Sequence, residues 1–166
     1  MRVFHGSTAI VRAPLVNVGR RHLDFGQGFY LTDMEEQAIS WAQRPLNQGR
    51  PQMLNVYELD MAAVAAMGCR YLRFTAYNQE WLDFVVANRR GEELWKNYDI
   101  VEGGIANDRV FNTIELYIAG LIPSEEALEK LRKEEPNNQI CILRQSIVDK
   151  CLHFIESREI GKEVAE

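Results

Sequence analysis

Short apolar runs alternate along the chain with stretches whose apolar side chains recur at helical spacing, and this alternation restricts the fold most. Residues 53–59 carry apolar side chains on both faces when extended, which is typical of a buried strand. The other expected strands cover residues 2–4, 29–32, 70–74, 98–101 and 139–143. The expected helices cover residues 62–67, 78–88, 107–119 and 146–155, with two more after Asp33 and from Ser124. No repeat or linker interrupts this mixture, so the sequence predicts one α+β domain over residues 1–156 and a polar tail over 157–166.

The helix expected after residues 29–32 has recognisable start signals. Asp33 is placed to cap its first turn, and the helix dipole favours Glu35 and Glu36 in that turn. The apolar face of this helix is expected to consist of Ala38, Trp41 and Ala42.

The charge balance limits the partners of the protein. Its 166 residues include 19 Lys and Arg against 24 Asp and Glu, which gives a net charge of −5. A protein that coats DNA or RNA needs a positive field, so this class is disfavoured. A nucleic-acid acceptor would need a local basic strip, for which Arg20 with Arg21 is the first candidate and Arg89 with Arg90 a weaker one.

Cysteine usage and the absence of targeting patterns favour a cytoplasmic protein. Cys69, Cys141 and Cys151 are widely spaced and odd in number, which fits neither a disulfide framework nor a zinc site. They are expected to be buried thiols, and no metal is expected. No signal peptide is visible, and no apolar run reaches the ~20 residues of a membrane helix, so no membrane partner is expected.

Two glycine-containing motifs are the candidates for chemistry. The first is His5-Gly6-Ser7, at the end of the first expected strand. A histidine can hydrogen-bond a hydroxyl group at neutral pH, and a neighbouring glycine lets a flat ligand approach the backbone. By itself the pair fits equally a histidine whose hydrogen bonds are satisfied at a strand end.

The second motif is Asp24-Phe-Gly26-Gln-Gly28-Phe-Tyr30-Leu-Thr, a glycine loop that leads into an expected strand. A tyrosine fixed next to such a loop can stack on a planar heterocycle, and Trp41 could supply a second ring. Both rings also fit plain packing residues. The loop is neither a Walker loop nor a Rossmann fingerprint, because the residues that must follow the glycines are missing. The remaining signatures of a kinase are missing as well.

Together the two motifs resemble the ADP-ribosyltransferase superfamily, in its histidine–tyrosine branch of diphtheria-type toxins and poly-ADP-ribose polymerases. The pattern VFHGST, GR, LDFGQGFYLT and QAISWA is similar to a bacterial family of small stand-alone proteins in that superfamily. The resemblance is specific over residues 3–42. It implies a split, strongly bent β-sheet with flanking helices, and NAD as the substrate.

The resemblance also implies roles for individual residues. His5 would hydrogen-bond the ribose on the nicotinamide side, Gly6 would pair with the carboxamide, and Tyr30 would stack on the nicotinamide ring. The other implied NAD-contacting positions are Ser7, Arg20 near the diphosphate, Gly28 in the loop and Trp41 as a second aromatic wall. Arg20 equally fits a solvated surface arginine.

The third catalytic position departs from the resembled pattern. In the histidine–tyrosine branch a glutamate usually begins a late strand, but here that strand begins with Gln139, preceded by Asn138. A glutamine can hold ribose hydroxyl groups but lacks the charge that stabilises a developing cation. Gln139 also fits a simple strand-edge residue. Glu102 and Asp108 are candidates for a general base, although Asp108 also fits the first turn of a helix.

The expected function is therefore an NAD-dependent mono-ADP-ribosyltransferase. It would cleave the nicotinamide–ribose bond and transfer ADP-ribose to an unidentified acceptor: a protein, a nucleic acid or a small molecule. The resemblance further implies an intracellular bacterial toxin of a toxin–antitoxin or phage-defence system, with a neutralising antitoxin protein as partner. The alternative is a catalytically silent NAD-binding or protein-interaction module on the same fold.

Overall fold

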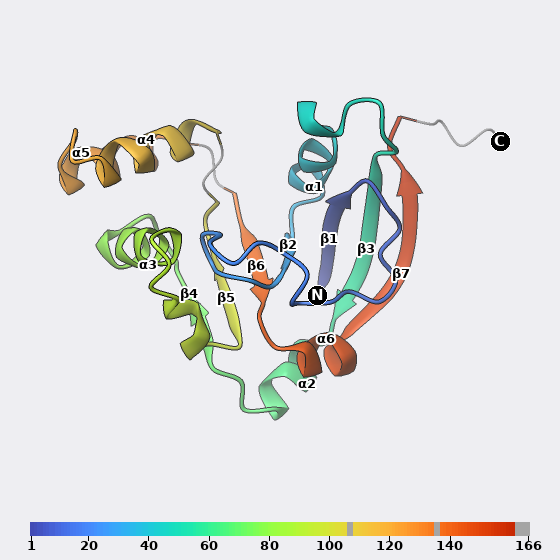
Figure 1. Cartoon of the computed structure of the whole chain (residues 1–166). Coiled ribbons are helices and arrows are strands. Elements are labelled where there is room, and N and C mark those ends of the chain that lie inside the picture. Colours follow the sequence, from blue (N-terminus) through green and yellow to red (C-terminus); the bar gives the residue numbers. More distant parts are fainter. Residues whose placement is uncertain (106–107, 135–136, 162–166) are drawn as a thin grey trace.

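The computed structural model describes residues 1–105, 108–134 and 137–161, and it has a mixed α+β architecture built on two sheets (Figure 1). The first sheet has three antiparallel strands in the order β1-β3-β7, formed by Arg2–Ser7, Met53–Leu59 and Leu152–Glu159. The second has the order β2-β6-β5-β4, formed by Phe29–Leu31, Gln139–Ile142, Ile100–Gly103 and Tyr71–Arg73. In the second sheet β4 runs parallel to β5, and the other neighbours are antiparallel.

The two sheets meet where β1 passes β2. The backbone N–H of Phe4 donates to Thr32 O at 2.8 Å, and the N–H of Thr32 donates to Phe4 O at 3.0 Å. Beside this bridge Val3, Leu31 and Tyr57 contribute to one buried apolar cluster that both sheets share. The bridge and the cluster fix the position of β1 relative to β2, which carry the two sequence motifs.

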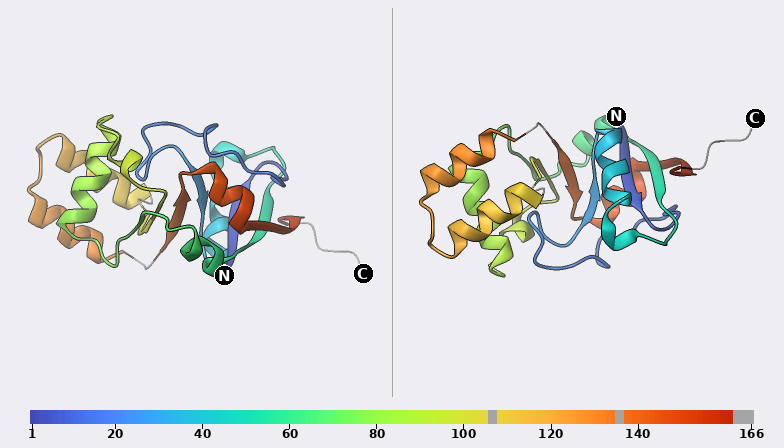
Figure 2. Two further views of the ribbon diagram at one scale, coloured as in Figure 1. Left: turned by 90° about the horizontal axis from the view of Figure 1, so that it is seen from below. Right: turned by 90° about the horizontal axis from the view of Figure 1, so that it is seen from above.

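Helices cover the two sheets on different sides. Helix α1 (Glu35–Ala42) packs on β1 and β3, and its neighbour in the chain is the short 3-10 helix η1 (Pro45–Asn47). Helices α3 (Gln79–Arg89), α4 (Asp108–Ile118) and α5 (Ser124–Arg132) form a layer on the far side of the second sheet (Figure 2). Helices α2 (Met61–Ala66) and α6 (Gln145–Cys151) contact each other, and the 3-10 helix η2 (Leu94–Asn97) precedes β5.

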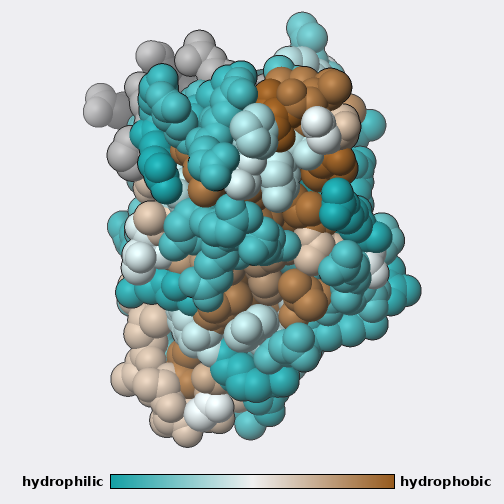
Figure 3. Space-filling view, turned by 90° about the vertical axis from the view of Figure 1, so that its left-hand side faces the viewer, coloured by the Kyte–Doolittle hydropathy of each residue, from teal (hydrophilic) through white to brown (hydrophobic). Residues whose placement is uncertain are grey.

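The outer face of the helical layer is mostly hydrophilic, with apolar side chains showing in separate patches (Figure 3). Beneath it, Phe25, Trp81 and Ile114 are fully buried in a second apolar cluster. Within the described residues no helix is both long enough and apolar enough to cross a bilayer.

The C-terminal part of the chain differs from the expectation. A helix over residues 146–155 is wrong, because α6 ends at Cys151 and the chain continues directly into strand β7. Pairing with β3 decides the conformation here, since Leu152 and Phe154 lie opposite Leu59 and Tyr57. Helical periodicity is a local signal, and a neighbouring strand with free hydrogen-bonding groups overrides it. Strand β7 runs to Glu159, and residues 162–166 lie outside the described part.

Two expectations about α1 are also wrong. Asp33 does not cap the helix; its carboxylate accepts a hydrogen bond from Asn138 Nδ2 at 3.1 Å, and the N-cap residue is Met34. Trp41 does not share the buried face with Ala38 and Ala42, because it is 40% exposed. The guanidinium of Arg44 stacks on it, 3.7 Å from the centroid of its ring.

Gly6 is required by the packing of α1 on β1, which leads to a stability prediction. A Cβ atom at Gly6 would lie 2.0 Å from Ala38 O and 2.9 Å from Ala42 N, both backbone atoms of α1. We therefore expect Gly6→Ala to lower the free energy of unfolding by about 1–3 kcal/mol or more, measured by urea denaturation.

Gly19→Ala is the matched control. Its Cβ would meet nothing closer than Gly28 O at 3.5 Å, so we expect a change within about 0.5 kcal/mol. Equal stability of the two variants would contradict the close approach of α1 to β1.

Candidate functional site

His5 lies on β1 at the junction of the two sheets. Its Nδ1 is 2.8 Å from Tyr30 O, and since a carbonyl oxygen only accepts, Nδ1 carries the proton in this bond. The neutral ring then presents Nε2 as an acceptor, and no hydrogen-bond partner for Nε2 is found among the described residues. Burial lowers the pKa of His5, against the smaller opposing effect of the bond to Tyr30, so the ring is neutral at pH 7.

The segment that follows β1 is held by a buried asparagine. Asn55 on β3 pairs with His5, donates to Ala9 O at 3.0 Å and accepts from the N–H of Val11 at 2.9 Å. Ser7 Oγ accepts from the N–H of Ala9 at 3.1 Å. The segment that follows the His-Gly-Ser motif is therefore fixed to the first sheet.

Tyr30 has its hydroxyl group committed to the glycine loop. Its O–H donates to Gly26 O at 2.6 Å, and the oxygen accepts from the N–H of Phe25 at 3.3 Å. Burial is the main cause that raises the pKa of Tyr30 well above its ordinary value, so the hydroxyl stays protonated. The sequence predicted a ring fixed beside the loop, and the structure agrees, with the ring partly buried against the cluster under α3.

Both glycines of the loop have a packing reason. Gly26 has a φ of +94°, and a Cβ there would lie 2.1 Å from the Trp95 ring. At Gly28 a Cβ would lie 2.6 Å from Cys141 Sγ on β6. The loop thus needs glycine to approach η2 and β6 closely.

Gln139 and Tyr30 lie on the same face of the second sheet. Tyr30 pairs with Cys141, and Gln139 stands two residues earlier on β6, so by the two-residue period of a strand their side chains project to the same side. Gln139 is 7% exposed, and its amide makes no hydrogen bond within the described part of the chain. It therefore has both donor and acceptor capacity to offer.

A pair of amides fastens α1 to the start of β6. Gln37 Nε2 donates to Asn138 O at 2.7 Å, and Gln37 Oε1 accepts from the N–H of Asn138 at 3.0 Å. Sequence reasoning missed Gln37, and no pattern marks it, because its partner is 101 positions away. This contact fixes the backbone directly before Gln139.

Glu102 is a buried carboxylate next to this contact. It is 3% exposed and accepts hydrogen bonds from Tyr71, from Arg73 Nε at 3.1 Å and from Asn138 Nδ2 at 3.0 Å. Burial by itself raises its pKa, but these hydrogen bonds outweigh burial, and the pKa lies below the ordinary value. Glu102 pairs with Ile140, so its side chain projects to the face opposite Gln139. It joins β5 to β4 and to the residue directly before β6, rather than standing free as a general base.

The other sequence candidates are the arginine pairs and Asp108. Arg20 is exposed. Arg21 pairs with Glu93 at 2.7 Å, and Arg89 pairs with Asp24 at 2.6 Å, so one arginine of each expected basic strip is engaged in an ion pair. Asp108 is the first residue of α4, and its side chain lies outside what the structure describes.

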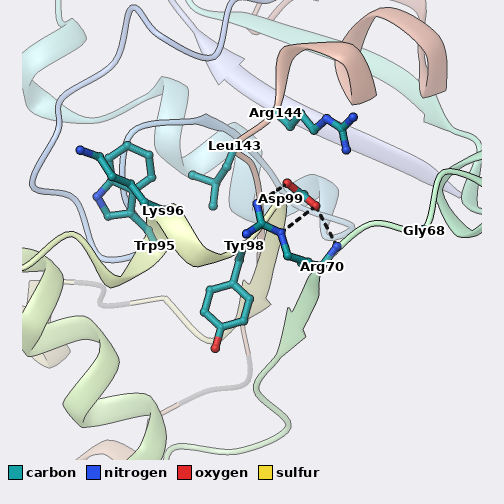
Figure 4. Close-up of a pocket in the computed structure, with 8 residues that line it drawn as sticks. All are labelled: Gly68, Arg70, Trp95, Lys96, Tyr98, Asp99, Leu143 and Arg144. Atoms are coloured by element: carbon teal, nitrogen blue, oxygen red, sulfur yellow. Dashed lines mark hydrogen bonds and ion pairs between the residues drawn. The ribbon is translucent and has the colours of Figure 1, made fainter.

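A pocket of about 550 Å³ lies at the other end of the second sheet, and none of the sequence-predicted site residues lines it. Its lining residues are Gly68, Arg70, Trp95, Lys96, Tyr98, Asp99, Leu143 and Arg144 (Figure 4). Over the described ranges no three His, Cys, Asp or Glu side chains gather in a way that could hold a metal ion.

The Glu102 network predicts a measurable stability effect. Glu102→Gln removes the negative charge that accepts hydrogen bonds from Arg73 and Tyr71. It also places an amide NH₂ group, which is itself a donor, next to these donors. We expect the free energy of unfolding at pH 7 to fall by about 1–3 kcal/mol. Glu126→Gln, which affects an exposed pair with Lys130 on α5, should change it by about 0.5 kcal/mol or less.

The pH dependence tests the same network. A carboxyl group whose folded pKa is depressed stabilises the protein above the unfolded value, ordinarily 4.5, and loses this contribution as the pH falls through the folded pKa. The difference in stability between wild type and Glu102→Gln should therefore shrink below pH 4.5. A difference in stability that stays constant from pH 7 to pH 3 would contradict a lowered pKa of Glu102 in the folded protein.

Comparison with known proteins gives a family but no described activity. A family model described as "Protein of unknown function (DUF3990)" matches residues 1–154. No curated protein and no solved structure matches the chain.

Proposed function

We propose that this chain, which belongs to the DUF3990 family, is an NAD-dependent mono-ADP-ribosyltransferase. The observation that supports the proposal most is the junction of the sheets, where the bond from His5 Nδ1 to Tyr30 O leaves Nε2 as an acceptor. Gln139 presents an uncommitted amide on the same face of the sheet as Tyr30. These are the three positions for which the sequence resemblance implies catalytic roles.

In the proposed reaction the bond between C1′ of the ribose and the nicotinamide nitrogen breaks, and its electron pair leaves with nicotinamide. The resulting oxocarbenium-like centre is captured at C1′ by a nucleophile of the acceptor, which loses its proton to solvent or to a base. His5 Nε2 would accept a hydrogen bond from a ribose hydroxyl group, and Tyr30 would stack on the nicotinamide ring. The backbone of Gly6 would bind the carboxamide.

Gln139 would hold ribose hydroxyl groups through its amide. It carries no negative charge, and the nearby carboxylate of Glu102 projects to the opposite face. Stabilisation of the developing cation is therefore weaker than with a glutamate at this position. This favours a single transfer or slow NAD hydrolysis over the synthesis of a polymer.

The second candidate is a catalytically silent module that binds NAD or a partner protein. The neutral Gln139 favours it, and so does Trp41, whose ring is covered by Arg44 instead of facing a ligand. The toxin role and the neutralising antitoxin belong to the main proposal and rest on the sequence resemblance, and the proposed cytoplasmic location rests on the cysteine usage and the lack of a targeting pattern.

The first test measures nicotinamide release and labelled acceptors after incubation with labelled NAD and cell lysate. Wild type should release nicotinamide, and His5→Ala should lower the rate by about 10²-fold or more, because the ribose loses an oriented acceptor. His153→Ala, an exposed histidine on β7, is the control and should retain the wild-type rate. The rate should stay constant above pH 6.5 and fall only at lower pH. The reason is that the pKa of His5 is lowered from 6.5, so Nε2 stays unprotonated and able to accept a hydrogen bond above that pH. Absence of both nicotinamide release and labelled acceptor would reject the proposal.

The second test separates the two candidates at Gln139. Under the main proposal Gln139→Ala lowers nicotinamide release by about tenfold or more with little change in NAD affinity, and Gln139→Glu raises the rate because it adds a negative charge near C1′. Gln79→Ala, an exposed glutamine on α3, should have no effect. NAD binding without turnover in wild type, unchanged in Gln139→Ala by calorimetry, would favour the silent module.

A further inference from the structure

The pocket at the far end of the second sheet does not include His5, Tyr30 or Gln139, although its lining residues Trp95 and Leu143 lie beside the glycine loop. It is bounded by the connection between α2 and β4, by η2 and the start of β5, and by the connection between β6 and α6 (Figure 4). Gln139 begins β6, whereas Leu143 and Arg144 follow its last residue. At ~3.3 Å per residue the two ends of this strand are on the order of 13 Å apart. A ligand in the pocket therefore lies away from Gln139, whereas Tyr30 is nearer, because it pairs with Cys141, two residues before Leu143.

The lining is positively charged although the chain is acidic. Three cationic side chains, Arg70, Lys96 and Arg144, stand against the one carboxylate of Asp99, while the whole chain carries −5. Lys96 also pairs with Glu93, which lies outside the lining. The local excess of positive charge favours an anionic ligand.

Asp99 orients Arg70 instead of filling the pocket. Asp99 Oδ1 accepts from Arg70 Nη2 at 3.0 Å, and Asp99 Oδ2 accepts from the backbone N–H of Arg70 at 2.8 Å. Both carboxylate oxygens thus accept hydrogen bonds from Arg70, and the pKa of Asp99 is lowered mainly by the hydrogen bond from the Arg70 side chain. The Arg70 side chain remains 60% exposed, so the rest of its planar fork is open to solvent.

Arg144 is the uncommitted cation of this group. Within the described residues no carboxylate lies in ion-pair distance of it, yet it is close enough to contribute to the lowered pKa of Asp99. In Figure 4 its side chain lies on the opposite side of Asp99 from Arg70. Two exposed guanidinium groups therefore line one pocket, on either side of the Asp99 carboxylate.

We propose that this pocket binds the phosphate group of a phosphomonoester through the solvent-facing N–H groups of Arg70 and Arg144. A guanidinium presents a fork of N–H donors that matches two phosphate oxygens, and a phosphomonoester carries about −1.5 to −2 charges at pH 7. Trp95 and Tyr98 also line the pocket, but the Tyr98 ring packs on Phe84 with 5.9 Å between the ring centroids, so the proposed recognition depends on the two guanidinium groups. This binding goes beyond the proposed transferase activity and does not depend on it.

Calorimetry with inorganic phosphate, uridine 5′-monophosphate and uridine tests the proposal on the full chain. Wild type should bind the monophosphate, and it should bind uridine at least about tenfold more weakly. Arg144→Gln should weaken binding of the monophosphate about tenfold, which corresponds to ~1.4 kcal/mol. Arg132→Gln, an exposed arginine on α5, should bind as wild type does. The side chain of Arg144 makes no hydrogen bond in the described part of the chain, so the unliganded melting temperature of Arg144→Gln should match that of wild type.

The proposal is overturned if wild type binds neither phosphate nor the monophosphate, or if Arg144→Gln binds with equal affinity. It is also overturned if NAD displaces the monophosphate in proportion to occupancy of the NAD site. A further arm compares a short single-stranded oligonucleotide with and without a 5′-phosphate. Tighter binding that requires the 5′-phosphate and Arg144 supports the proposal and identifies a nucleic-acid end as the source. Tighter binding that is independent of the 5′-phosphate overturns it in favour of backbone recognition. Because the readout is binding, failure of the transferase proposal leaves these outcomes unaffected.

Discussion

Two backbone hydrogen bonds between Phe4 and Thr32 join the two sheets, and the arrangement of the candidate site depends on them. They bring β1 beside β2, so His5 reaches Tyr30 O across the junction. On its other edge β2 pairs with β6, which carries Gln139. Three residues separated by up to 134 positions in the chain therefore belong to one continuous set of strands.

Close backbone packing holds this junction in place. Gly6 lets the backbone of α1 approach β1, and Gly28 lets the glycine loop approach Cys141. Gln37 then fastens α1 to the start of β6, because the nitrogen and the oxygen of its side-chain amide both bond to the backbone of Asn138. Residues that the resemblance assigns to NAD binding thus have packing roles as well, and substitutions at Gly6 change stability together with any ligand affinity.

The second sheet separates two chemical environments at its two ends. At the start of β6 a neutral amide and a ring lie on one face, while the ionised Glu102 on the opposite face is fully engaged by Tyr71, Arg73 and Asn138. Beyond the end of β6, Arg70 and Arg144 flank an open pocket. Trp95 lies between these regions, because it lines the pocket and packs on Gly26, whose carbonyl accepts the hydroxyl of Tyr30.

Much of the fold could be predicted from local patterns. The candidate residues were identified through the resemblance that the two glycine motifs carry. The sequence by itself determined the mixed α+β class, most strand and helix positions and the two glycine motifs, because periodicity and glycine placement are properties of neighbouring residues. Only the tertiary structure decided that residues 152–159 form a strand, that Asp33 binds Asn138 and that Trp41 is exposed. The network around Glu102 and the pocket with Arg70 and Arg144 were likewise decided there. Each of these depends on partners brought together from distant positions, and the hydrogen bonds and charges that they share have no counterpart in local sequence.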